Sequence, residues 1–243
     1  MVGPSFKEHH LPAYPQNPNS TLPESDLVGR TLREIEFPDS SKTLGRFKSH
    51  DFFGDGSFYL LYTLGHTPEH LCGLARTSTS PDTFVFMGGD ACHHSGEMRP
   101  TQHLPLPKAL DPSPMPRVHA TPCPGELLAS IHPHQHKSAT SPFYYVTPQL
   151  SYYKKLADWS IAGLGEFDGQ PDENVLIVLA HDGTMIDPPQ FPMYPESMND
   201  WYERGIGQGV RWRFLESFAP AVEEKSKGGQ PCNWGDTGVM GAE

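Results

Sequence analysis

Three short segments of the chain carry side chains that can bind a divalent metal ion. They are GHTPEH at residues 65–70, GGDACHH at 88–94 and AHD at 180–182. Each follows a stretch expected to form a strand, where a loop presents its side chains on a rigid support. Imidazole and carboxylate groups are suitable donors for zinc and similar ions. Turn or capping roles explain each segment when it is taken alone, so the order of the three together is what indicates metal chemistry.

The stretches around these segments have the composition of strands. Residues 57–63 and 83–87 are rich in aromatic, β-branched and aliphatic side chains, and turn sequences at 54–56 and 80–82 separate them from their neighbours. This alternation predicts a sheet built largely from hairpins. The expected strands are residues 32–37, 47–53, 57–63, 70–76, 83–87 and, as an unbroken apolar run, 174–180.

A helix is predicted over residues 148–165. Thr147 and Pro148 suit the N-cap and the first helical position, and apolar residues then recur at spacings of three and four. These residues are Leu150, Tyr153, Leu156, Ala157, Ile161 and Leu164. Aromatic anchors in residues 198–218 predict short helices that pack against the sheet, whereas the polar, Gly-rich residues 221–243 are expected to be a flexible tail.

The sequences YTLGHTPEHL, FVFMGGDACHH and VLIVLAHD, in this order, resemble the later motifs of the metallo-β-lactamase superfamily. They are most similar to the branch that holds N-acyl homoserine lactonases and related fungal metallohydrolases. The resemblance covers roughly residues 1–215. It implies an α/β (α+β) fold, a partial αββα sandwich made mainly of its carboxy-terminal half. It also implies a single, amino-terminally truncated domain over residues 1–220, with a Pro-rich loop at 100–148.

The same resemblance implies a zinc centre with hydrolase activity. Carried over by motif, His66, Asp90 and His181 are the metal ligands, and Asp90 bridges two zinc ions at the reacting centre. His93 lies near the position where related lactonases place a side chain that polarises the substrate carbonyl, so it is a second candidate catalytic residue. The implied substrate is a small-molecule lactone, ester or thioester.

The metal centre of the family is completed by an earlier H-x-H-x-D-H loop, and no such sequence precedes His66 here. The resemblance therefore leaves three of the seven family ligands, whereas a zinc ion normally has three or four protein donors. We expect hydrolysis by this chain to be impaired or absent. The alternative is a non-catalytic pseudoenzyme or interaction protein that keeps the half-fold.

Without the half that supplies the second sheet, the inner face of the first sheet is expected to be uncovered. Several hundred Å² of uncovered apolar face forfeits on the order of 10 kcal/mol, which is comparable to the stability of a whole domain. We therefore expect self-association through this face. The opening residues, with Val2 among them, resemble the end of a strand, so we expect this sequence to be a fragment of a longer one.

A second histidine-rich segment, HPHQH at residues 132–136, has the H-x-H spacing that places two rings on one side of an extended strand. It follows Asp90 instead of preceding His66, and three interpretations stay open: part of the same site, a separate surface metal binder, or a solvated loop. Apolar residues of the same Pro-rich loop suggest a lid. They are Leu104, Leu106, Leu110, Met115 and Phe143.

Side chains next to the candidate ligands have supporting interpretations. Asp182 either orients His181 through the second ring nitrogen or caps a turn. His70 is expected to be a strand residue. Glu69 stands where the family has the second glycine of GHTPGH, which adds a charge close to the site.

Charge and hydropathy disfavour other function classes. The chain has 18 basic and 29 acidic side chains and a formal net charge of −11 at pH 7, which disfavours binding to nucleic acid. No apolar run approaches the roughly 18 residues that span a bilayer, and the amino terminus lacks the pattern of a secretory signal. Four widely spaced cysteines indicate reduced thiols. We therefore expect a cytoplasmic protein without a membrane partner.

Overall fold

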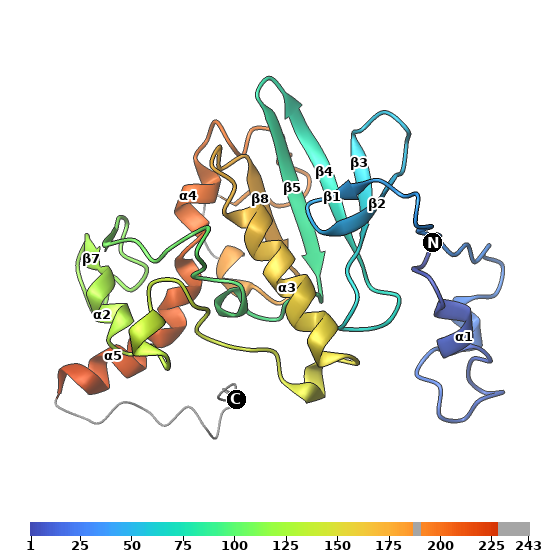
Figure 1. Cartoon of the computed structure of the whole chain (residues 1–243), viewed down its shortest axis with the longest axis horizontal. Coiled ribbons are helices and arrows are strands. Elements are labelled where there is room, and N and C mark those ends of the chain that lie inside the picture. The colour runs from blue at the N-terminus through green and yellow to red at the C-terminus, as the bar shows by residue number, and fades with distance from the viewer. Residues whose placement is uncertain (187–190, 228–243) are drawn as a thin grey trace.

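The computed structural model of the chain describes residues 1–186 and 191–227, and its centre is a six-stranded mixed sheet (Figure 1). Strands β1 to β5 pair antiparallel in chain order, and β8 pairs parallel with β5 at one edge. The strands are β1 (Thr43–Leu44), β2 (Phe47–Asp51), β3 (Phe58–Tyr62), β4 (Leu71–Thr79), β5 (Asp82–Gly89) and β8 (Val175–Leu179). With its helices, this sheet forms a partial α/β sandwich, as the resemblance implies.

The hairpins follow the predicted pattern. Strand β2 returns as β3 after the turn at residues 54–56, and β4 returns as β5 so that Thr79 faces Asp82. Side chains alternate between the two faces because the strand repeat is two residues. Strand β8, the unbroken apolar run, has four of its five residues buried, which is the expected burial of a strand covered on both faces.

The first of the six expected strands, at residues 32–37, is not formed. Only an isolated bridge joins Glu34 to Val2, and the side chain of Glu34 is bonded to the backbone and ammonium group of Lys7. Phe37 stacks on Tyr62 of β3 instead of pairing with a strand. This amino-terminal part also holds α1 (Phe6–His10) and η1 (Glu24–Asp26), and α1 lies beside the sheet at the right of Figure 1.

The main helix, α3 (Lys154–Asp168), lies across one face of the sheet (Figure 1). Its buried residues Ala157, Ile161 and Leu164 pack on the central core cluster. That cluster contains Phe47, Leu61, Cys72, Leu74, Phe86 and Ile177 from the strands. This is the apolar face that the three- and four-residue spacing predicts.

The helix begins six residues later than the sequence predicts. Thr147 and Pro148 instead open a short 3₁₀ turn, η4 (Pro148–Leu150), and the Thr147 side chain makes no cap hydrogen bond. The amides of Tyr152 and Tyr153 donate to the carbonyls of His66 and Gly65, both at 3.0 Å. The backbone before α3 is therefore bonded to the GHTPEH loop and cannot continue a helix.

The Pro-rich segment 100–148 folds as a second core and not as an open lid. It contains the two-stranded ladder of β6 (Ala109–Leu110) and β7 (Cys123–Pro124), together with α2 (Gly125–Ala129) and η3 (Gln135–Lys137). Its apolar residues pack against η6 (Arg213–Phe218). Leu106, Leu110, Met115 and Phe143 are buried there with Phe214 and Phe218.

The carboxy-terminal region differs from the predicted tail. Helix α5 (Ala219–Ser226) runs into it and buries Ala221 and Val222 in the second core. Residues 228–243, the rest of the predicted tail, lie outside the described residues. Short helices over residues 198–218 are confirmed as α4 (Ile206–Val210) and η6.

The second face of the sheet is covered at one end. Trp201 and Ile206 pack on Val85 of β5 and Leu176 of β8. Toward β3 and β4, the apolar residues of this face are only partly buried, and the Met87 side chain is 39% exposed. The others in this stripe are Phe58, Leu60 and Leu71, all half-buried. We call these four residues the open stripe.

A buried ion pair fixes the segment after β5 to α3. The Arg99 guanidinium donates two hydrogen bonds to the Asp168 carboxylate, at 2.6 and 2.8 Å, and its third donor reaches the carbonyl of Arg211. Arg211 lies 3.5 Å from the same carboxylate. These groups are almost fully buried, so removing one partner would leave an uncompensated charge in the core.

Cys72, Cys92 and Cys123 are buried free thiols, as predicted, and burial raises the pKa of Cys72 to about 12. Cys232 lies outside the described residues. Among the described helices, none is long and apolar enough to cross a membrane.

Candidate metal centre

The candidate centre lies where β5 and β8 end side by side. Because these strands are parallel, their carboxyl ends meet at one edge of the sheet, with Gly89 opposite Leu179. Asp90 and His181 follow directly, and the His181 Nε2 atom lies 2.7 Å from the Asp90 Oδ1 atom. The sequence thus places the two side chains together through the parallel pairing of two strands that are far apart in the chain.

His93 completes the closest group of donors. One donor atom each from Asp90, His93 and His181 lies within 4.8 Å of the other two. Asp90 and His93 are half-buried, whereas His181 is exposed. The Nδ1 atom of His93 is buried and has no hydrogen-bond partner in the described structure. A half-buried imidazole beside a carboxylate and a second imidazole suits a metal ion.

The environment of His93 favours the neutral ring that metal binding needs. Burial lowers its pKa, and the neighbouring rings of His66 and His181 lower it further, against an opposing effect of Asp90. A neutral imidazole has a free lone pair for coordination, whereas an imidazolium has none.

His66 lies beside this group on a different support. Its ring centre is 4.9 Å from that of His93, and its Nδ1 atom donates to the Leu150 carbonyl over 3.2 Å. Gly65, which precedes it, has φ +128°, and a Cβ atom there would come within 2.1 Å of the Ala157 nitrogen of α3. A glycine is therefore required for the His66 loop to approach the start of α3 so closely.

His70, the second histidine of GHTPEH, holds the main chain of Asp90. Its Nε2 atom accepts the Asp90 amide hydrogen at 3.2 Å, so the ring proton is on Nδ1 and points to the Thr63 hydroxyl at 2.8 Å. Burial lowers the pKa of His70 to about 4, which keeps this ring neutral. It directly precedes β4 and orients the loop that carries a candidate ligand.

The loop that carries His93, residues 91–97, is hydrogen-bonded to the loop that carries His181. The Ser95 hydroxyl donates to the Asp182 carboxylate, which also caps the 3₁₀ turn η5 (Gly183–Met185) through the Thr184 amide. In the preceding turn, η2 (Ser95–Glu97), the Glu97 carboxylate accepts the His93 amide hydrogen at 3.1 Å. Of the two interpretations of Asp182, the capping one is observed, and its second oxygen bonds the opposite loop.

Glu69 is held by the amino-terminal part of the chain. Its Oε1 atom lies 2.7 Å from the Nε2 atom of His10, and its Oε2 atom is buried without a partner in the described structure. The charge that replaces the family glycine is thus directed to α1 and paired there when His10 is protonated.

The histidines of residues 132–136 are not part of this centre. His132 is 1% exposed, and its Nε2 atom donates to the Ser141 carbonyl while its Nδ1 atom accepts the His134 amide hydrogen. Its ring packs on Phe143 in the second core. Both ring nitrogens are used by the backbone, which contradicts the solvated-loop interpretation at His132 and leaves this ring no lone pair for a metal.

The structure therefore brings all four candidate residues to one edge of the sheet. The closest donors are Asp90, His93 and His181, and His66 is their neighbour. The spacing Asp90-x-x-His93 could have indicated from sequence that both side chains face one ion. Ser95 and Glu97 carry no such signal, because their partners are reached only through the folded loops.

Known proteins that are similar to this chain include one named a metallo-hydrolase, which agrees with a metal centre at this sheet edge. The chain is 40% identical over 224 residues to the metallo-hydrolase mfmC of Annulohypoxylon moriforme. The aligned residues are 91% of this chain and 56% of mfmC. It is 39% identical over 227 residues to the γ-lactamase FDB1 of Fusarium pseudograminearum, and the aligned residues are 92% of this chain and 53% of FDB1. The γ-lactamase MBL2 of Gibberella moniliformis is 42% identical over 159 residues, 65% of each chain.

No protein-family model and no solved structure matches the chain. The chain spans about half the length of mfmC and FDB1. The sheet, its edge cluster and these relatives define the class as a metallo-hydrolase homologue. Similarity to fungal proteins named metallo-hydrolase and γ-lactamase supports the metallo-β-lactamase-like fungal branch that the motifs of the chain resemble.

Proposed function

We propose that the chain carries a zinc site of a hydrolase that opens a cyclic amide or ester. The observation that supports this most directly is the convergence of Asp90, His93 and His181 within 4.8 Å. Two imidazoles and one carboxylate form a donor set found in catalytic zinc sites, where the remaining position is open. Zinc in such a set supplies Lewis-acid polarisation of a carbonyl and lowers the pKa of water.

The residues of the chain have distinct roles in this proposal. Asp90 and His181 hold each other in place across the strand ends, and the His70 ring fixes the Asp90 backbone. His66 is the neighbouring imidazole that the family resemblance also makes a ligand. His93 either binds the ion, which requires the neutral ring that its surroundings favour, or donates a hydrogen bond to the substrate carbonyl.

The substrate class follows the relatives and the motifs. FDB1 and MBL2 are γ-lactamases by name, so a lactam is the first substrate to test, with a lactone, ester or thioester as the class that the motifs imply. Three close donors suffice for one ion but not for a pair. We therefore propose that this chain by itself binds one zinc ion and turns over slowly.

The proposal is tested by zinc content and ring opening in the same samples. Wild-type protein, Asp90→Asn and the control Asp111→Asn, an exposed carboxylate far along the chain, are dialysed against zinc and analysed for bound metal. Opening of a γ-lactam and of the matching γ-lactone is then followed by chromatography. We expect Asp90→Asn alone to lose zinc and ring opening. Equal zinc in all three proteins, or turnover that survives chelation, contradicts the proposal.

A second candidate function is a non-catalytic interaction role, and the open stripe favours it. Phe58, Leu60, Leu71 and Met87 present an apolar surface on one face of the sheet. The partner we propose is a second copy of the chain, since burying this surface in a dimer removes it from water.

Sedimentation velocity tests this second role. We expect wild-type protein to associate as its concentration rises and Met87→Lys to shift it toward monomer. Val28→Lys is the control, because Val28 is 70% exposed outside the sheet. A wild-type protein that stays monomeric, or a Met87→Lys variant that associates equally, overturns the dimer. Association without zinc-dependent turnover favours the interaction role over the hydrolase.

We also propose a cytoplasmic location, which is supported by the buried free thiols of Cys72, Cys92 and Cys123. Thiols persist in reducing compartments. Cell fractionation checks this location, and recovery from a secretory fraction contradicts it.

A further inference from the structure

A cleft of about 880 Å³ lies between α3 and the returning ends of the Pro-rich segment. Its walls come from residues 97–103, 137–148 and 154–166. Buried apolar side chains form its floor, including Met98, Val146 and Ile161. Pockets for small organic ligands have this size and are mostly apolar with a few polar groups.

The charged groups of this cleft leave an excess of positive charge. Arg46 is paired with Glu166, and Lys154 lies 2.7 Å from Asp158. Two more ammonium groups, those of Lys137 and Lys155, are exposed on its walls. Neither ammonium group makes an ion pair with any residue in the ranges that the structure describes.

The remaining carboxylate, Glu97, is directed into the protein, because its side chain is almost fully buried and accepts the His93 amide hydrogen. Even with Glu97 counted, four cationic side chains line the cleft against three carboxylates. A cleft with unpaired cations is a notable local feature in a chain whose formal net charge is −11.

We propose that this cleft binds a small organic carboxylate with an apolar body. The apolar floor removes the hydrocarbon part from water, and Lys137 and Lys155 attract the carboxylate at the opening. Neither part alone specifies the ligand: a neutral alcohol lacks the charge attraction, and an inorganic anion lacks the apolar contact.

None of the four candidate residues of the metal centre lines the cleft, but two lining residues belong to segments that are hydrogen-bonded to it. Glu97 lines the cleft and bonds the His93 backbone, while Pro148 lines it at the turn whose Leu150 carbonyl accepts from His66. Ring opening of a lactone yields a carboxylate, so the ligand class of the cleft matches the product of the proposed function. This match rests on the proposed function. The binding itself does not, since no metal contact is needed for it.

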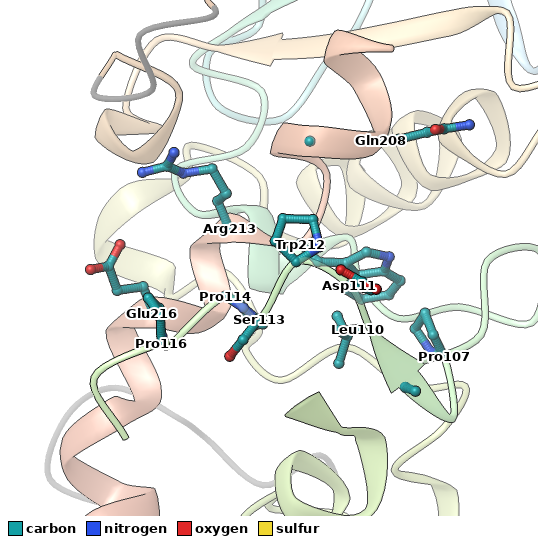
Figure 2. A pocket seen from close by; sticks show the side chains of 13 residues that line it. Pro107, Leu110, Asp111, Ser113, Pro114, Pro116, Gln208, Trp212, Arg213 and Glu216 are labelled. Atoms are coloured by element: carbon teal, nitrogen blue, oxygen red, sulfur yellow. The ribbon is translucent and has the colours of Figure 1, made fainter. Parts of the chain in front are cut away.

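A second hollow, of about 440 Å³, provides a contrast within the same molecule. Trp212, Asp111 and Pro114 line it, and Figure 2 shows Arg213 and Glu216 to one side of Trp212. This hollow carries two carboxylates against one guanidinium, so its charge does not favour an anion. Arg213 is therefore a matched control for removal of a cation beside a cavity.

Calorimetry with sodium octanoate on the metal-free and the zinc-treated chain tests the inference, with 1-octanol as the neutral probe. We expect one octanoate per chain in both preparations and weaker binding at higher salt. The Lys137→Ala/Lys155→Ala variant should lower octanoate affinity about fivefold to tenfold without the same loss for octanol. Ala162→Trp, which fills the cleft from an exposed position of α3, should abolish binding of both.

Arg213→Ala should bind octanoate as the wild type does. No saturable octanoate binding by the wild type overturns the inference, as does binding that both cleft variants retain. Circular dichroism establishes that each variant is folded, which is expected because Lys137, Lys155 and Ala162 are exposed and Arg213 is half-buried. Octanoate binding in a chain that neither binds zinc nor opens rings leaves this inference intact while the proposed function fails.

Discussion

Two groups of histidines in this chain have different structural roles, one at the candidate metal centre and one in and beside the second core. His66, His93 and His181 come from segments far apart in sequence, and their rings lie within about 5 Å of a neighbour at one sheet edge. His132 and His134 are only two residues apart, yet His132 is packed in the second core with both nitrogens bonded to backbone.

The difference shows that local spacing is a poor guide to a metal site in this molecule. The H-x-H spacing directs two rings to one side only if the segment is an extended strand, and residues 132–136 instead lead into η3. Asp90 and His181 need no local spacing, because paired strand ends bring them together.

The largest expected effect separates the two groups directly. His181→Ala removes one of the three close donors, so zinc affinity should fall by more than about a hundredfold, beyond the 10–100-fold cost of losing a partner that only orients a ligand. His136→Ala should leave affinity unchanged. Competition with a zinc-binding dye measures both, and equal affinities would remove the functional distinction between the groups.

A smaller effect ranks the ligands inside the first group. His93→Ala should weaken zinc binding about tenfold more than His66→Ala, because His93 belongs to the closest donor set while the His66 ring donates to Leu150. The same dye competition gives the ratio. A larger loss for His66→Ala would instead support the ligand set carried over from the family resemblance.

A smaller effect again is expected at the connection between the two ligand loops. Ser95→Ala removes the hydroxyl that bonds Asp182, which should weaken zinc binding about threefold to tenfold, the usual net worth of such a hydrogen bond. Ser226→Ala, where the hydroxyl bonds the Val222 carbonyl of its own helix, is the control. Identical zinc affinity in the two variants would mean that the loops are held without Ser95.

The smallest expected effect is on the pH dependence of the free energy of unfolding, through His132 of the second group. Burial lowers the pKa of His132 below 6.5, so between the folded and unfolded values the unfolded chain binds more protons. The free energy of unfolding should therefore rise with pH in this window and be fully restored above about 6.5. Urea unfolding at several pH values should show a shallower dependence for His132→Gln than for wild type or His136→Gln. Parallel curves for all three would place the pH dependence elsewhere.

Much of the sheet was predictable because each strand carries its own signal. The aromatic and aliphatic composition of β3 and β5 and the apolar run of β8 identify strands without knowledge of their partners. The expected strand at 32–37 failed because composition does not show whether a pairing partner exists. The helix start failed for a related reason, since the amides of Tyr152 and Tyr153 bond the His66 loop.

The candidate site divides in the same way. Motif order identified His66, Asp90 and His181 as ligands, and the resemblance to related lactonases identified His93 as a substrate-polarising residue. Its place within the closest donor group, and the buried, unpartnered Nδ1 atom, are visible only in the structure. The prediction of a single domain over residues 1–220 stays a prediction.

The sequence by itself determined which residues can bind a metal, where most of the strands end, and that the chain carries a formal net charge of −11. These are properties of residue type and local periodicity. Only the tertiary structure decided that four of the metal-competent side chains meet and that His132 does not join them. It also decided that two lysines beside an apolar cleft have no ion-pair partner among the described residues. The reason is that contacts between distant segments depend on strand pairing and helix docking, which no local pattern encodes.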